Sequence, residues 1–259
     1  MSRTLVAATS LALTLLACKQ EPPPNLAPVA QPIVAPQAAT ASAVKLTVLT
    51  ASSSASWLMD APREKIFGEL PGGLSGELYV DASDLTKTTG LVHVNLGTML
   101  LSQEKMGDGA TTFGARTTED KQNEHARTWL EISADAPAEA RAKNAQATLV
   151  LKSVTTTGAA DLGKLSGEER TIKAKITGDL VLHGRQTSHT IDVAVTGHYA
   201  GDTLVALHVK TLSPLTVNLE SHDVRPRDAF GKLAKNTLAK LSHAVAATAP
   251  VNVVIVARP

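Results

Sequence analysis

Short runs in which apolar and polar residues alternate with a period of two recur through most of this chain. In residues 91–96 the side chains of Val92, Val94 and Leu96 share one face, and residues 190–195 repeat the pattern. Successive side chains of a β-strand point to opposite faces of the sheet, so this period is typical of a half-buried strand and not of a helix. The alternation therefore predicts a fold dominated by short strands.

Eight further runs of this kind are separated by Gly, Asp, Ser and Pro: residues 46–49, 56–60, 74–80, 147–154, 172–183, 203–211, 215–219 and 251–257. About ten short strands with turns between them predict an all-β fold, either an antiparallel sandwich or a barrel. The chain has no repeat of fixed period, which argues against propellers and solenoids.

Two segments depart from the strand pattern. Residues 119–130 are charged, with Glu119 and Asp120 at the start, where acidic side chains suit a helix N-terminus, so a short helix is expected there. Residues 227–247 read as an amphipathic helix that Pro226 precedes. This second helix could lie across a barrel mouth or along the outside of the barrel.

The N-terminus has the parts of an export signal. Arg3 provides a positive charge, residues 5–16 are mostly apolar, and the small residue Ala17 precedes Cys18. Leu15-Leu16-Ala17-Cys18 resembles the bacterial lipobox, in which the cysteine is lipidated and becomes the mature N-terminus. The alternatives are an ordinary signal peptide with an incidental cysteine and a short buried helix. Cys18 is the only cysteine, so an internal disulfide is excluded.

These patterns divide the chain into three parts. Residues 1–17 are expected to be a lipoprotein signal peptide, residues 18–44 a disordered tether, and residues 45–259 one β-barrel domain. The second part carries six prolines and no aromatic residue, a composition that favours extended, unpacked chain. Lys19 and Gln20 follow the cysteine in place of the retention aspartate of many enteric lipoproteins. A lipid anchor in the bacterial envelope, at the outer membrane and facing the periplasm, is therefore expected.

The charge of the chain argues against one class of partner. It has 25 Lys and Arg against 24 Asp and Glu, without the basic excess that nucleic-acid binding leaves. Aromatic residues make up only 3% of the chain, so a pocket inside it is expected to be aliphatic.

The order of the segments resembles the YceI-like family of periplasmic proteins. The resemblance is carried by residues 74–97, by residues 121–130 with His125 retained, by the Gly178 to Gly184 segment Gly-Asp-Leu-Val-Leu-His-Gly, and by residues 215–224. It covers most of residues 46–257. It implies an extended, lipocalin-like antiparallel barrel with an apolar interior that binds a polyisoprenoid or an isoprenoid quinone.

The resemblance and the alternation together give a set of candidate residues. His125 and Arg127 are candidates for contacts near a ligand head group. Gly184 permits a tight turn after His183, and a buried histidine at such a turn more often binds backbone than a ligand, so His183 is only a secondary candidate. The expected apolar lining consists of Val94, Leu96, Val150, Leu182, Val193 and Val195.

No enzymatic activity is expected. The strand histidines have no partner at metal-ligand spacing, and the serines lie outside any Gly-x-Ser-x-Gly motif, so neither a metal site nor catalytic residues are predicted. An enzyme is kept only as a third hypothesis, because His125 has no other explanation. The second hypothesis is a structural or interaction lipoprotein whose barrel is filled and binds no ligand.

Overall fold

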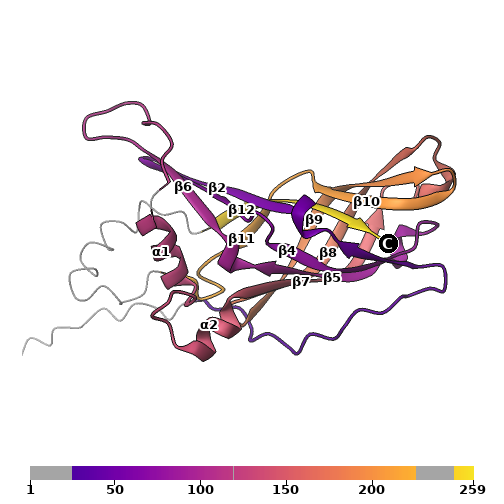
Figure 1. Ribbon diagram of the computed structural model, residues 1–259, viewed down its shortest axis with the longest axis horizontal. Helices are drawn as coiled ribbons and strands as arrows, with labels where there is room; N and C mark the ends of the chain where they lie inside the picture. The colour runs from indigo at the N-terminus through magenta and orange to yellow at the C-terminus, as the bar shows by residue number, and fades with distance from the viewer. Residues whose placement is uncertain (1–24, 119, 226–247) are drawn as a thin grey trace, which may run out of the picture.

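The computed structural model of the protein describes residues 25–118, 120–225 and 248–259, which form an elongated barrel of antiparallel strands with two short helices at one end (Figure 1). Cys18 and the expected signal peptide lie outside the described residues, as does the helix predicted at residues 227–247. No helix among the described residues is long and apolar enough to cross a membrane.

The described part of the chain contains twelve strands: β1 (Val44–Val48), β2 (Ser54–Ala61), β3 (Glu64–Glu69), β4 (Leu74–Val80), β5 (Thr89–Asn95), β6 (Leu100–Lys105), β7 (Gln146–Thr156), β8 (Glu169–Leu182), β9 (Arg185–Ala200), β10 (Thr203–Thr211), β11 (Leu215–Asn218) and β12 (Thr248–Arg258). The α-helices are α1 (Asp120–Trp129) and α2 (Ala138–Asn144). Four 3-10 turns complete the elements: η1 (Thr50–Ser52), η2 (Leu85–Lys87), η3 (Leu96–Thr98) and η4 (Leu162–Lys164).

Eight of these strands close a barrel. They pair in the order β1, β4, β5, β7, β8, β9, β10 and β12, and β12 pairs back to β1 through Thr47 with Arg258 and Val48 with Ala257. All the pairings are antiparallel. The predicted all-β, lipocalin-like antiparallel barrel is therefore confirmed.

The barrel is prolonged at one end by strands that pair with the first half of β12. β11 continues the line of β10 along one edge of β12, and β2 continues the line of β1 along the other. β3 and β6 then add to β2. Between β1 and β2, the side chain of Ser53 replaces backbone hydrogen bonds to β12. Its hydroxyl accepts from the amide of Val256 at 3.0 Å and donates to the carbonyl of the same residue at 3.3 Å.

The alternation in the sequence places one face of each barrel strand inside. In β9 every second residue from Ile191 to Tyr199 is buried, and the residues between them are partly exposed. On the outer face, Lys175 of β8 lies 2.6 Å from Asp192 of β9. Such an exposed pair adds little stability, so burial of the inner face is the main stabilising contribution to this hairpin.

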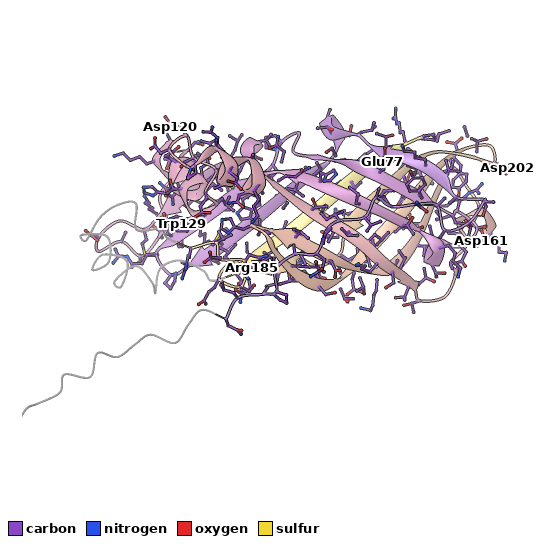
Figure 2. All side chains as sticks on the ribbon, turned by 90° about the horizontal axis from the view of Figure 1, so that it is seen from below. Glu77, Asp120, Trp129, Asp161, Arg185 and Asp202 are labelled. Atoms are coloured by element: carbon purple, nitrogen blue, oxygen red, sulfur yellow. The ribbon has the colours of Figure 1, made fainter. Side chains whose placement is uncertain are left out.

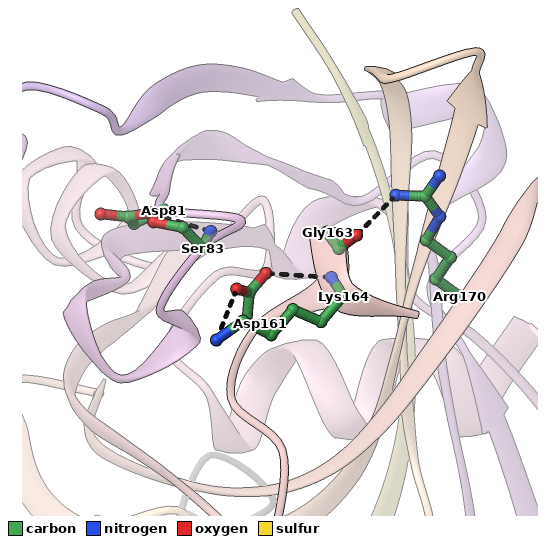
Figure 3. Close-up of polar contacts among 6 residues, drawn as sticks. All are labelled: Asp81, Ser83, Asp161, Gly163, Lys164 and Arg170. Carbon is green, nitrogen blue, oxygen red and sulfur yellow. Dashed lines mark hydrogen bonds and ion pairs between the residues drawn. The ribbon is translucent and has the colours of Figure 1, made fainter. Parts of the chain in front are cut away.

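One end of the barrel is plugged by the turns η2 and η4. Leu85 and Leu162, at 2% and 0% exposed, point into the core from these turns. The two turns hold each other in place, because Leu85 donates its amide to the carbonyl of Ala160 and Leu162 donates to the carbonyl of Ala82. Figure 3 shows the polar contacts around this closed end, including the hydrogen bond from Arg170 to the carbonyl of Gly163.

Residues 25–43, part of the segment expected to be a disordered tether, contact the outside of the barrel at both ends. Near the β8–β9 turn, Ala27 donates its amide to the carbonyl of Ser221 at 2.8 Å, and Ala30 donates to the carbonyl of Gly184 at 3.0 Å. At the closed end, Thr40 and Ser42 donate to a carboxylate oxygen of Asp81, each at 2.7 Å. Composition alone did not indicate this docking, which depends on hydrogen-bonding groups of the barrel.

Asp81 gives a test of this packing. Burial by itself raises the pKa of the Asp81 carboxyl, but hydrogen bonds from Ser83, Thr40 and Ser42 outweigh burial and hold this pKa well below its usual range. A depressed pKa stabilises the fold above the unfolded-state pKa, about 3.9 for Asp, and this stabilisation is lost as the pH falls below that value.

We therefore predict that Asp81→Asn lowers the free energy of unfolding at pH 7 by about 1 to 3 kcal/mol. The difference between the two proteins should shrink as the pH falls from 4 towards 2. Urea unfolding followed by circular dichroism across this range measures both values. A difference that stays constant with pH would contradict the assigned role of the Asp81 carboxylate.

Candidate functional site

The prolonged end of the barrel contains a cavity of about 240 Å³. Its lining comes from α1 and from every described strand except β1, β9 and β10, and it consists almost entirely of aliphatic side chains with the indoles of Trp57 and Trp129. Inward-facing residues such as Val94 and Val253 keep some accessible surface although they lie inside the barrel. The described side chains of this half of the barrel therefore do not fill its interior.

A second, smaller cavity of about 70 Å³ lies towards the closed end, where Leu78, Val80 and Leu85 contribute to its wall. Val92, Leu149 and Ile255 line both cavities. These three side chains form the constriction that separates the two spaces. The interior is thus a larger chamber beside α1, followed by a smaller one that ends at the plug.

Within the described parts of the chain, polar side chains reach the larger cavity from α1. Of the described lining residues, Gln122 and His125 carry an amide and an imidazole group, and His125 is the one that is exposed to solvent. The amide of Gln122 donates to Glu64 of β3 at 3.1 Å. Figure 2 shows α1, with Asp120 and Trp129, at the end of the barrel opposite Asp161 and Asp202. The solvent-facing end of the cavity is therefore the α1 end.

Asn123 fixes α1 against the edge strand β6. It is 6% exposed, and its side-chain amide accepts from the Leu101 amide at 2.9 Å and donates to the Leu101 carbonyl at 3.3 Å. The side chain takes the place of a neighbouring strand and satisfies two backbone groups that an edge leaves unpaired. This anchorage holds Ala126 and Trp129 over the cavity.

Trp57 forms part of the wall because its cross-strand partner is a glycine. Trp57 of β2 pairs with Gly68 of β3, and a Cβ at position 68 would overlap the indole ring. The absence of a side chain at Gly68 lets the ring lie flat across β3. Trp57 therefore contributes one large surface to the cavity.

Four of the residues predicted from the sequence lie in the wall of the larger cavity: Val94, Leu96, His125 and Leu182. Val195 lines the smaller cavity, and Val193 is buried in the core without lining either one. The structure thus brings one predicted polar residue and four predicted apolar residues to the two cavities.

The other three predicted residues lie elsewhere. Val150 lies on the outer face of β7, because its neighbours Leu149 and Leu151 take the inward positions, and it does not line a cavity. Arg127 of α1 is partly exposed and outside both walls. The imidazole of His183 is buried and lies 3.2 Å from the Glu131 carboxylate, at a turn where His183 has a φ of 51°.

A fully buried histidine that was not among the predicted residues supports the same end of the barrel. Nδ1 of His222 lies 3.2 Å from the Leu182 carbonyl, which can only accept, so this nitrogen carries the hydrogen. Nε2 of His222 then accepts from the Thr187 hydroxyl at 3.0 Å, and Thr187 lies 2.7 Å from Nε2 of His189. Burial lowers the pKa of His222, which favours its neutral form.

Among the residues that the structure describes, no three His, Cys, Asp or Glu side chains gather where they could hold a metal ion. His198 and His208 lie side by side, with ring centroids 4.1 Å apart, and Glu169 is the carboxylate nearest to His198, at 3.6 Å.

Sequence reasoning missed much of the cavity wall. The missed residues include both tryptophans, Met59 and Ile66 of the β2–β3 hairpin, and Leu215, Val217 and Leu219 around β11. β3 and β6 were not predicted as strands, so the residues that they contribute to the cavity wall were not predicted to face the interior. The alternation of Leu215, Val217 and Leu219 was a usable signal, because these residues share one face.

Comparison with known proteins gives no matching family model and no matching curated protein. Several solved structures are similar to this chain, and two of them follow. A polyisoprenoid binding domain from Saccharophagus degradans, implicated in plant cell wall breakdown, is 17% identical with a TM-score of 0.47, over 82% of this chain and 97% of that one. BcnA of Burkholderia cenocepacia is 15% identical with a TM-score of 0.47, over 81% and 98%. At these values neither similarity assigns a ligand to this chain.

The strand pairing and the cavity define the class of protein directly. The chain forms a closed antiparallel β-barrel with an apolar chamber inside it, and one helix brings polar groups to the open end of that chamber.

Asn123 gives a test of how the site is held together. We predict that Asn123→Ala lowers the free energy of unfolding by about 1 to 3 kcal/mol, because the buried amide and carbonyl of Leu101 lose their partners. Hydrogen exchange of residues 120–129 should also become faster, since α1 is released from β6. Glu124→Ala, at an exposed position of the same helix, is the control. Unchanged exchange in the Asn123 variant would show that α1 is held by other contacts.

Proposed function

We propose that this chain is a non-enzymatic, lipid-anchored binding protein of the bacterial cell envelope. It holds the apolar tail of an isoprenoid-like amphiphile inside the barrel. The observation that carries the proposal is the cavity of about 240 Å³ with its nearly continuous aliphatic wall. Among the residues that the structure describes, no Asp, Glu, Lys or Arg side chain lines this cavity, so an ionised ligand group inside it would lose its hydration without a partner from these residues. An uncharged, apolar ligand segment fits these walls.

The volume of the cavity limits how much of a ligand it can hold. Dedicated pockets for drug-sized ligands start at roughly 300 Å³, whereas an apolar cavity of about 150 Å³ is enough for benzene. A space of about 240 Å³ therefore suits a short apolar segment. A longer tail would also need the smaller chamber, which it reaches when Val92, Leu149 and Ile255 change rotamers.

We infer that the head of such an amphiphile lies at the α1 end, and the polar groups there support this. Gln122 and His125 lie in the wall there and can hydrogen-bond a carbonyl or hydroxyl head, such as that of a quinone.

The anchor and the location complete the proposal. Residues 1–17 are the signal peptide, Cys18 carries the lipid, and the barrel is held at the outer membrane, facing the periplasm. The alternative of a structural lipoprotein with a filled barrel requires an interior without space, and the cavity argues against it.

The direct test is the content of protein purified from its native envelope. Mass spectrometry of an organic extract should find one hydrophobic compound at close to one molecule per chain. Extracts from several preparations that contain no stoichiometric hydrophobic compound would contradict the proposed function.

The constriction offers a matched pair of variants. We predict that Leu149→Trp fills the passage between the chambers and lowers the affinity for the bound compound about 5- to 150-fold, because inserting bulk into a packed interior costs about 1 to 3 kcal/mol. Val150→Trp adds the same bulk to the outer face of the same strand and should leave binding unchanged. Both variants should first be shown to fold by thermal unfolding. Equal binding by the two would show that the cavity is not the ligand site.

A further inference from the structure

The two ends of the barrel differ in ways that bear on how it sits at a lipid surface. The far end is plugged by Leu85 and Leu162, whereas the solvent-facing wall of the large cavity is at α1. β9 runs from one end to the other, starting at Arg185 beside the docked N-terminal segment. The end that holds this segment is therefore the end with the open chamber.

The docking of the N-terminal segment at this end is extensive. Val29 forms a bridge with Arg185 of β9, and the Arg185 guanidinium donates to the carbonyl of Ala27 at 3.2 Å. The amide of Gln186 donates to the carbonyl of Pro28 at 2.9 Å, and the amide of Gln31 donates to the side chain of Gln186 at 3.2 Å. The chain is thus fixed to the barrel from residue 27 onwards.

This docking shortens the free tether. Eight residues lie between Cys18 and Ala27, and the nine residue-to-residue steps of this segment, fully extended, reach at most roughly 30 Å. The sixteen residues of β9, at about 3.3 Å each and with the usual tilt of barrel strands, span roughly 35 to 40 Å between the two ends. The lipid at Cys18 can therefore not reach a membrane that touches the closed end.

The surface next to the docked segment suits a lipid interface. Val29 is 65% exposed, although it is a large aliphatic side chain. Arg185 lies beside it, and Lys143 of α2 lies over the neighbouring turn, where a Cβ at Gly184 would be 3.2 Å from its Nζ. Two acidic groups near this surface are paired, Glu131 with His183 and Asp179 with Lys152, whereas Glu220, next to Ser221, is exposed. An exposed apolar residue flanked by two cations is a combination that interfacial membrane contacts use.

We propose that the lipid-anchored protein stands with the α1 end of its barrel against the membrane surface, so that the cavity opens towards the bilayer. This inference rests on the proposed anchor at Cys18. It adds a direction of transfer to the proposed function, because an amphiphile would enter from the lipid side without crossing water.

Site-directed spin labels at the two ends test this orientation. Glu124→Cys places a label on exposed α1, and Asp202→Cys places one at the closed end. Cys18, the only native cysteine, is consumed by lipidation and takes no label. The lipidated variants are incorporated into phosphatidylcholine and phosphatidylglycerol vesicles that contain a nickel-chelating lipid. The label at position 124 should show a relaxation enhancement several times that of the label at position 202.

A third variant isolates the effect of the tether. Twenty Gly and Ser residues inserted between Pro24 and Asn25 remove the length limit, so the two labels should become similar. A difference that persists after the insertion would overturn the role of the short tether. Equal responses in the protein without the insertion, or a larger response at position 202, would overturn the orientation.

Flotation with the vesicles tests the lipid anchor separately from the orientation of the barrel. Protein that does not float has no anchor, and that result overturns the anchor and the orientation together. Floating protein with equal label responses overturns the orientation alone. Mass spectrometry of an organic extract of the same preparation shows whether a ligand is bound. This measurement does not depend on the flotation or on the label responses.

Discussion

The whole architecture depends on the backbone hydrogen bonds that β12 makes along both of its edges. On one side β12 pairs with β10 and β11, and on the other with β1 and β2. An open sheet would leave the backbone groups of β1 unpaired on this side, and closure removes that edge. The contacts join the last residues of the chain to its first strand. The Ser53 hydroxyl keeps them continuous where the chain turns from β1 into β2.

Closure also explains why the interior is divided. Around the plugged end, eight strands surround a space narrow enough for Leu and Val side chains to fill most of it, apart from the small chamber. At the other end, β2 pairs with β3 and β3 with β6, and none of these three strands pairs with β4 or β5. Helix α1 packs against β6 on this side of the cavity. The wall is wider there, and aliphatic side chains do not meet across it. The larger cavity is thus a product of the change in strand pairing along β12.

Alternation in the sequence predicted most barrel strands, because burial of one face leaves a period of two. The charged run at residues 119–130 predicted the short helix α1. Alternation missed β3 and β6, whose runs Glu64–Glu69 and Leu100–Lys105 are short and carry several charges. It also missed α2, although Pro137 followed by Ala, Glu, Arg and Lys is a helix signal. Alternation shows which residues share a face but not which face is interior, so Val150 was placed inside while its neighbour Leu149 lines both cavities.

The central claim is that the barrel interior holds an accessible apolar space, and xenon tests it most directly because dry apolar cavities of this size bind xenon. Methyl NMR spectra of ligand-free protein can be recorded with and without xenon pressure. The account predicts that the methyl signals of Val94, Leu149 and Val253 shift in a saturable way, while those of Val150 on the outer face stay in place. If the interior methyl signals shift no more than those of Val150, the barrel is filled and the account is wrong.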